Sequence, residues 1–138
     1  MSTTRRTPTS DFLDCPCRGV TLDKLIQPAI LALLAAGPLH GYLIAKKVGE
    51  MPLMHGREPD ASGVYRFLRA MLRKGLVVAA WDLSEKGPAK RCYEITDQGR
   101  ACLGQWVATL EGYRQGIGAL LKLSRRAVGS GRKAGERE

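Results

Sequence analysis

Residues 61–74 constrain the fold most, because their apolar side chains recur at helical spacing. A helix there would turn one stripe toward a core, and that stripe consists of Val64, Phe67, Leu68, Met71 and Leu72. The opposite face holds no carboxylate and consists of Ser62, Tyr65, Arg66, Arg69 and Arg73. Solvated helix faces usually mix charges of both signs. A face with positive charge alone therefore favours a helix that packs against an anionic partner.

Two further helices are predicted before this one. Residues 22–36 have the pattern of a first helix, in which Pro28 either introduces a kink or marks the first turn. Residues 40–50 predict a second helix. Its apolar positions are Tyr42, Leu43, Ile44 and Val48, and its water-facing lysines are Lys46 and Lys47. Residues 51–60 contain two prolines and a glycine, which is typical of a loop. Gly75 is the expected end of the third helix.

The pattern changes after Gly75 from helical to β-prone. Residues 76–83 and 91–95 flank the turn-forming residues 84–90, which predicts a β-hairpin with a basic tip. Thr96 and Asp97 then cap a last helix that we expect to run to about Leu123. This order of elements is typical of a winged helix-turn-helix domain followed by a long helix. The expected fold class is therefore mainly α with a small β-hairpin.

This interpretation divides the chain into four regions. We expect a flexible extension at 1–20, a winged helix-turn-helix domain at 21–96, a dimerisation helix at 97–123 and a basic, disordered tail at 124–138.

The last helix carries a second apolar stripe, with alternating spacings of three and four residues as in a coiled-coil seam. The stripe consists of Leu103, Trp106, Leu110, Tyr113, Ile117 and Leu120. A lone helix with such a stripe needs a partner, and a two-fold homodimer is the simplest one. The alternative is that the stripe folds back on its own domain.

The charge of the chain points to an anionic partner. Its 22 Lys and Arg outnumber 13 Asp and Glu, which gives a net charge of +9 and favours nucleic acid or an anionic membrane surface. No apolar stretch approaches the roughly 20 residues that span a bilayer, and the N-terminus is polar. We therefore expect a cytoplasmic protein without a membrane partner. The chain has no phosphate-binding glycine loop and no catalytic constellation, so we expect neither an enzyme nor a cofactor.

In a helix-turn-helix, the second helix of the pair enters the major groove with its first turns. We therefore expect DNA contacts from this helix and from the hairpin tip, at Ser62, Gly63, Tyr65, Arg66, Arg69, Lys86, Lys90 and Arg91. An arginine can read guanine or hold a phosphate, and the sequence leaves both roles open for Arg66 and Arg69. The alternative for both basic surfaces is simple solvation.

Two cysteines near the N-terminus form the motif Cys15-Pro16-Cys17. Their spacing is not the two-residue spacing of zinc ribbons or thioredoxin-like sites. A metal, thiol-redox or haem-sensing role for Cys15 and Cys17 stays open beside the interpretation as incidental cysteines in an unstructured tail. No other metal site is expected.

Three blocks of this sequence resemble the PadR-like family of transcriptional regulators. Residues 33–42, Leu-Leu-Ala-Ala-Gly-Pro-Leu-His-Gly-Tyr, look like its signature opening. Val64-Tyr65, Leu68-Arg69 and Gly75-Leu76 are similar to its recognition helix. Residues 87–99 resemble its wing and the entry to its dimerising helix. The resemblance covers roughly residues 22–122.

The resemblance implies a bacterial, dimeric winged-helix repressor. It implies that Tyr65 contacts the DNA backbone and that the last helix forms a dimer interface with a ligand-responsive cavity. Trp106 would be the candidate for stacking an aromatic effector. The chain departs from the family at residues 61–63, Ala-Ser-Gly in place of Pro-Gly-Thr, and at Pro88, which replaces a basic residue of the wing.

The leading hypothesis is thus a homodimeric repressor that binds double-stranded DNA and is released by a small-molecule effector. A thiol- or metal-dependent redox protein that uses Cys15 and Cys17 is one alternative. A winged-helix module that binds another protein is the other.

Overall fold

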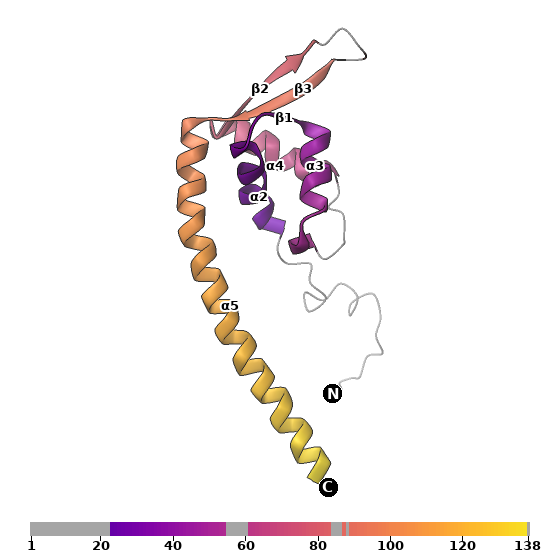
Figure 1. Cartoon of the computed structure of the whole chain (residues 1–138), viewed down its shortest axis with the longest axis vertical. Helices are drawn as coiled ribbons and strands as arrows, with labels where there is room; N and C mark the ends of the chain where they lie inside the picture. The colour runs from indigo at the N-terminus through magenta and orange to yellow at the C-terminus, as the bar shows by residue number, and fades with distance from the viewer. Residues whose placement is uncertain (1–22, 55–60, 84–86, 88, 138) are drawn as a thin grey trace, which may run out of the picture. The chain divides into compact units, whose positions relative to one another are not determined.

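The computed structural model describes residues 23–54, 61–83, 87 and 89–137. The chain divides into two compact units, Met1–Arg100 and Ala101–Glu138. We call the first unit the head. Its described part contains three α-helices and a small sheet, and the second unit is the body of one long helix (Figure 1).

Helix α2 (Ile26–Ala35) follows a short 3-10 helix, Asp23–Leu25. The prediction of one continuous helix over residues 22–36 is therefore wrong for 23–25, and residue 22 lies outside the described residues. Pro28 is buried in the first turn of α2. A main-chain N–H group at this position would have no carbonyl partner within the helix, so the proline breaks no hydrogen bond. This settles the alternative that the sequence left open for Pro28.

Helix α3 (Gly41–Gly49) begins one residue later than predicted. His40 has extended backbone angles, with φ −72° and ψ 151°, and ends the short strand β1 (Leu39–His40). Part of the predicted loop at 51–60 is the 3-10 helix Pro52–Met54. Tyr42 is 54% exposed and supplies no core position of α3, contrary to the sequence prediction.

Helix α4 (Ala61–Arg73) lies where the amphipathic pattern predicts it. The main-chain N–H of Leu76 donates to the carbonyl oxygen of Met71 at 2.9 Å, and that of Gly75 to Leu72 at 3.1 Å. Gly75 has a φ of +77°, a conformation that glycine adopts without strain. The predicted end of the helix is confirmed.

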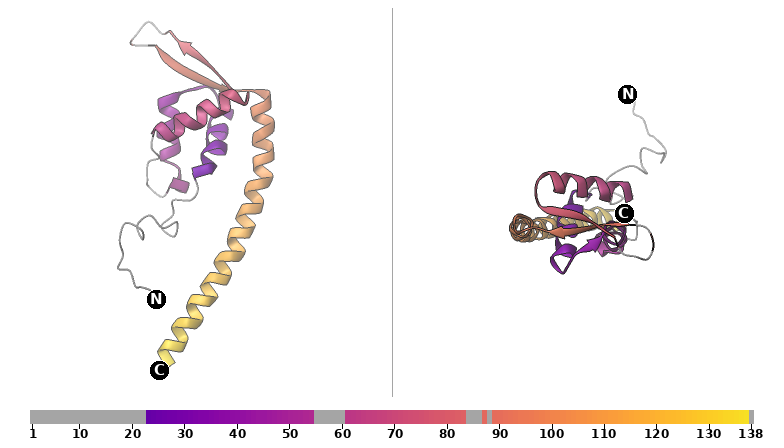
Figure 2. Two further views of the ribbon diagram at one scale, coloured as in Figure 1. Left: turned by 180° about the vertical axis from the view of Figure 1, so that it is seen from behind. Right: turned by 90° about the horizontal axis from the view of Figure 1, so that it is seen from above.

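The sheet is antiparallel and has the order β1-β3-β2. Strands β2 (Val77–Asp82) and β3 (Lys90–Ile95) form the predicted hairpin, which we call the wing. Figure 2 (left) shows that the wing projects beyond the three helices of the head. Strand β1 was not predicted, because two residues are too short to show a period. The sheet therefore has three strands and not two.

The three helices and the sheet share one core. Its largest fully buried side chains are Ile30, Leu31, Leu34, Ile44, Val48, Val64, Leu68, Met71 and Val77. The predicted stripe of α4 supplies three of them, while Phe67 and Leu72 are half-buried. The amphipathic pattern thus fixed the orientation of α4, with its basic face away from the core.

The last helix, α5 (Asp97–Arg137), begins inside the head. Thr96 caps it: the N–H of Gly99 donates to the Thr96 hydroxyl oxygen at 2.9 Å. The Thr96 hydroxyl in turn lies 2.7 Å from the carbonyl oxygen of Gly75 and donates to it. A side chain on Gly99 would collide with the carbonyl oxygen of Leu76. The first turn of α5 is therefore fastened to the end of α4.

Helix α5 does not end near Leu123, as the sequence predicted, but continues to Arg137. The predicted boundary between a helix at 97–123 and a disordered tail at 124–138 is therefore wrong. Residues 119–128 are mostly Leu, Lys, Arg and Ala without proline, and such residues propagate a helix readily. Within the part of the chain that the structure describes, no helix is long and apolar enough to cross a bilayer.

Candidate nucleic-acid interface

The outer face of α4 consists of the side chains opposite its buried stripe, namely Tyr65, Arg66, Arg69 and Arg73. The three arginines are exposed and Tyr65 is half-buried. Gly63, which the sequence placed among the DNA contacts, is buried. The side chain of Ser62 and all of Lys86 lie outside the described residues. The face keeps the purely positive charge that the sequence indicates.

Tyr65 packs against the first residue of α3. A Cβ atom added to Gly41 would lie 2.8 Å from Cε1 and 3.2 Å from the hydroxyl oxygen of Tyr65. It would also lie 3.3 Å from Cε1 of Tyr93. Real Cβ atoms do not approach aromatic carbons as closely as 2.8 Å, so only glycine leaves room for both rings. Gly41 thereby positions the phenol that the sequence singles out on α4.

Tyr93 lies in strand β3 of the wing and has Tyr65 and Arg69 of α4 as electrostatic neighbours. It is 3% exposed, and burial raises the pKa of its phenol, while the positive charges of Arg91 and Arg69 act against that rise. The guanidinium carbon of Arg91 lies 5.7 Å from the centroid of the Tyr93 ring, a cation–π contact. The sequence reveals Arg69 and Arg91 only as separate cations, whereas the structure gathers them around one buried phenol.

A second aromatic side chain accompanies Lys90. The Lys90 ammonium nitrogen lies 5.4 Å from the centroid of the Tyr42 ring. Tyr42 also stacks on His40, with ring centroids 6.4 Å apart and ring planes inclined by 19°. Sequence reasoning missed His40 and Tyr42 as members of this surface. Both residues flank Gly41 at the start of the first helix of the helix-turn-helix, and this position could have indicated their role.

These groups surround a hollow of about 190 Å³ between the start of α3, the outer face of α4 and the wing. It is lined by His40, Gly41, Tyr42, Tyr65, Lys90 and Arg91. Ammonium, guanidinium and phenol groups are the side chains that hold phosphate oxygens in protein–DNA complexes. The structure thus brings together three of the sequence-predicted contact residues, Tyr65 of α4 and Lys90 and Arg91 of β3.

A carboxylate at the base of the wing is paired. Asp82 Oδ2 lies 2.9 Å from His40 Nε2, and Asp82 is the residue directly opposite Lys90 in the β2–β3 ladder. This carboxylate therefore stands between two groups that carry or can carry positive charge.

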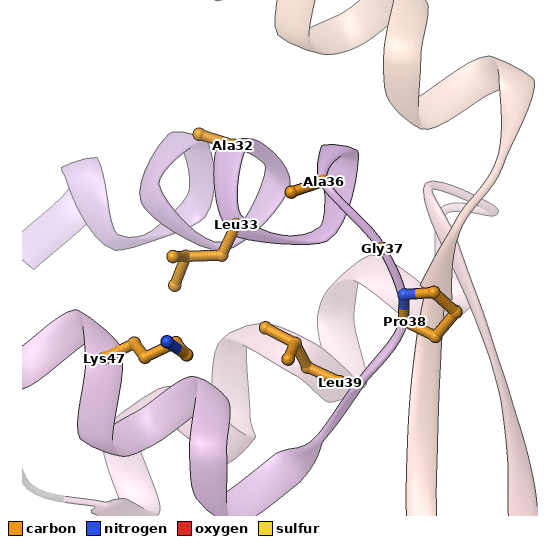
Figure 3. Close-up of a pocket in the computed structure, with 7 residues that line it drawn as sticks. All are labelled: Ala32, Leu33, Ala36, Gly37, Pro38, Leu39 and Lys47. Carbon is orange, nitrogen blue, oxygen red and sulfur yellow. The ribbon is translucent and has the colours of Figure 1, made fainter.

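A larger hollow of about 340 Å³ lies elsewhere in the head, between the end of α2 and α3 (Figure 3). Its lining is apolar apart from one lysine and consists of Ala32, Leu33, Ala36, Gly37, Pro38, Leu39 and Lys47. It shares no residue with the hollow at Tyr65. It offers no groups that would bind a phosphate apart from Lys47, so it does not extend the basic surface.

The apolar stripe of α5 is exposed over most of its length. Leu103 and Trp106 are half-buried, and the side chains that follow are 36% to 61% exposed: Leu110, Tyr113, Ile117 and Leu120. At helical spacing the stripe continues beyond the predicted seam through Leu121 to Val128, which are also exposed. A helix stripe of this length in contact with water is typical of an interface.

The same helix has a long stretch without acidic residues. Residues 112–135 contain no Asp or Glu and six cations: Arg114, Lys122, Arg125, Arg126, Arg132 and Lys133. Arg114 pairs with Glu111, the last carboxylate before this stretch, at 2.6 Å. The positive charge of α5 is therefore concentrated in its distal two thirds.

The possible metal ligands Cys15 and Cys17 lie outside the described residues. Among the residues that the structure describes, no three His, Cys, Asp or Glu side chains gather as metal ligands would.

Residues 30–105 match the model of the transcriptional regulator PadR-like family. A candidate transcriptional regulator from Thermoplasma acidophilum is 33% identical with a TM-score of 0.65, and the match covers 73% of this chain and 94% of that one. A PadR family transcriptional regulator from Eggerthella lenta is 25% identical with a TM-score of 0.57, over 72% of this chain and 80% of that one.

A third similar structure is that of Bacillus subtilis PadR in complex with operator DNA. It is 27% identical with a TM-score of 0.53, and the match covers 61% of this chain and 47% of the Bacillus chain. The present chain thus matches about half the length of that protein. The search of curated proteins found no match.

Proposed function

The chain belongs to the PadR-like family of transcriptional regulators, and from that premise we propose that it is a homodimeric repressor that binds operator DNA in the cytoplasm. The observation that carries this proposal is the continuity of the outer face of α4 with the cations of the wing around Tyr65 and Tyr93. One positively charged surface with a protruding helix and a hairpin matches the shape of duplex DNA.

In this proposal the first turns of α4 enter the major groove. Arg66 and Arg69 are exposed and would read base edges or hold phosphates from that position. Tyr65 is held by its contact with Gly41, so its hydroxyl is oriented before DNA arrives. Lys90 and Arg91 would grip the backbone beside the groove.

The exposed stripe of α5 supports the homodimer. A two-fold pair of such helices would bury the side chains from Leu103 to Val128 against each other. A dimer would also set two copies of α4 about one duplex turn, roughly 34 Å, apart along the DNA. Binding of one head to its half-site then holds the second head close to the other half-site, which raises the affinity above that of a single head.

Release by an effector is the regulatory part of the proposal. Trp106 lies within the stripe of α5 and is half-buried, and an indole can stack on an aromatic molecule. An effector that binds one dimer geometry more tightly than the other would shift the spacing of the two α4 helices. DNA affinity would fall by the same coupling factor.

The test is a gel-shift titration with the duplex upstream of the protein's own gene, with random duplex as competitor. Operator affinity should fall steeply with salt, because the slope of log K against the logarithm of the salt concentration is about −0.9 for each phosphate contacted. Arg69→Ala should relax sequence preference, whereas Lys90→Ala should weaken all duplexes alike. Arg126→Ala, which removes an exposed cation of α5, is the matched control. Equal affinity for random and upstream duplex would contradict the repressor.

The dimer has a separate test in the sedimentation mass of Leu110→Asp. A carboxylate in the centre of the stripe should dissociate the pair, since a buried unpaired charge is strongly unfavourable. A dimer of unchanged mass would exclude the α5 stripe as the interface.

A further inference from the structure

Exposure along β2 rises sharply on one face of the wing. Alternate residues of a strand share a face, and on this face Val77 is 1% exposed, Ala79 is half-buried and Trp81 is 62% exposed. A tryptophan usually buries most of its large apolar surface. The indole of Trp81 therefore lies just beyond the point where the core ends.

The register shows which side of the sheet this face is on. Ala79 pairs with Tyr93 and Trp81 pairs with Arg91, so the side chains of each pair are neighbours on one face. Tyr93 is buried and has Tyr65 and Arg69 of α4 as electrostatic neighbours. Helix α4 also contacts β2. Trp81 thus stands on the side of the wing that α4 covers, one pair further out.

The surroundings of Trp81 are positively charged. Its neighbour Arg91 directs its guanidinium over the ring of Tyr93, toward the basic surface at α4. Trp81 is therefore an apolar surface at the margin of the positively charged hollow. An occupant of this margin must be anionic next to Arg91 and apolar against the indole. The sugar–phosphate backbone has both properties, because deoxyribose rings alternate with phosphates.

We propose that Trp81 is a DNA-binding residue of the wing, whose indole packs against deoxyribose in the minor groove beside the major groove that α4 enters. Apolar side chains are used in this way by proteins that bind the minor groove. The inference rests on the proposed function and adds an apolar contact to a surface otherwise described by charge. Such a contact favours duplex shape without reading sequence.

The experiment compares Trp81→Ala with Trp81→Phe and Val78→Ala, in binding to the upstream duplex and to random duplex. Val78 is 52% exposed on the opposite face of the same strand, so its truncation is a matched control. Trp81→Ala should weaken binding to both duplexes by about tenfold, as truncation of an aromatic anchor does. Trp81→Phe should restore most of the affinity, and Val78→Ala should leave it unchanged.

Two further readouts separate an apolar contact from loss of fold or charge. The salt slope of Trp81→Ala should equal that of the wild type, whereas Arg91→Ala should lower it by about 0.9. With 5-fluorotryptophan at both tryptophans of the chain, the resonance that Trp81→Phe removes should shift when duplex is added to the wild type.

Each outcome decides between two claims. Wild-type protein that prefers no duplex contradicts the proposed function itself. Wild-type protein that binds the operator, with Trp81→Ala of equal affinity or with an unshifted Trp81 resonance, overturns only the Trp81 contact. A lower sedimentation mass for Trp81→Ala would also overturn it, because the indole would then belong to an interface between copies.

Discussion

His40 Nε2 lies 2.9 Å from Asp82 Oδ2, although the two residues are 42 positions apart in the chain. The contact joins β1, directly before α3, to the outer end of β2. It passes over β3, which is the central strand of the sheet. The wing is therefore held to the helix-turn-helix by a side-chain contact as well as by the strand ladder.

This contact should be measurable as a coupling between two substitutions. We expect a double-mutant cycle of His40→Ala and Asp82→Ala to give a coupling free energy of unfolding of about 0.5 kcal/mol, the range of exposed pairs. Urea unfolding at neutral pH is the measurement. The cycle of His40→Ala with Glu50→Ala, a carboxylate at the other end of α3, should be additive. Additivity in both cycles would show that the His40–Asp82 contact contributes nothing.

Gly41→Ala should destabilise the head. The added Cβ would lie 2.8 Å from a ring carbon of Tyr65, so the ring must move, and overpacking of this kind raises the free energy of the folded state by about 1–3 kcal/mol. Operator affinity should fall as well, because Tyr65 leaves its position. Urea unfolding and gel-shift titration measure the two effects.

A second glycine provides the control for this prediction. Gly112 of α5 has open space where a Cβ would be, so Gly112→Ala should stabilise the helix by up to about 1 kcal/mol. Tyr65→Ala in the Gly41→Ala background should remove the steric conflict and recover part of the stability. A Gly41→Ala protein as stable as the wild type would show that Tyr65 does not pack there.

Tyr93 should make the stability of the fold depend on pH in alkaline solution. Burial raises the pKa of its phenol above the ordinary value of 10.0. Below that value tyrosine is neutral in both states, and its contribution to stability is fully present. As pH rises above it, the unfolded chain loses the proton first, so the free energy of unfolding falls.

The titration can be followed by phenolate absorbance together with urea unfolding in the same alkaline range. Tyr93→Phe should remove the part of the alkaline loss that belongs to this residue. Tyr113→Phe, at a residue 49% exposed in α5, should leave that part in place. An alkaline stability profile that is the same for Tyr93→Phe and the wild type would contradict the role of burial.

The extension of the α5 stripe to Val128 can be tested against a matched residue. Val128 is 60% and Leu123 is 58% exposed, but only Val128 lies in line with Ile117 and Leu121 at helical spacing. Val128→Asp should raise the dimer dissociation constant by about tenfold or more, and Leu123→Asp should not change it. Sedimentation over a concentration series measures both. The reverse ranking would place the interface on the other side of α5.

Elements with a strong period could be predicted from sequence, whereas contacts between distant segments could not. Helix α4 was located within a residue because its buried stripe repeats over three turns. Strand β1 was missed because Leu39 and His40 are too few to show alternation. The length of α5 was underestimated because glycines near residue 130 were weighed more heavily than the helix-forming residues before them.

The candidate interface divides in the same way. The exposure of Arg66 and Arg69 could be predicted because they lie opposite the apolar stripe of α4, on a face without acids. The roles of Gly41, Tyr42 and Tyr93 depend on side chains that approach from other elements, which no local spacing reveals. Trp81 is apolar and lies in a β-prone segment, and no local pattern distinguishes it from a core residue. Its exposed fraction of 62% shows that the core ends before it, and the register of β2 against β3 places it on the face of Arg91 and Tyr93.

In the proposed homodimer, the stretch of α5 without acidic residues would give two opposite responses to ionic strength. Two copies that paired along this helix would bring like charges together, and at physiological salt their repulsion is largely screened only beyond about 8 Å. Added salt would therefore tighten the pairing of two copies while it loosens their hold on DNA. An intermediate salt concentration would give the greatest occupancy of an operator, and this occupancy would respond to ionic strength without any ligand.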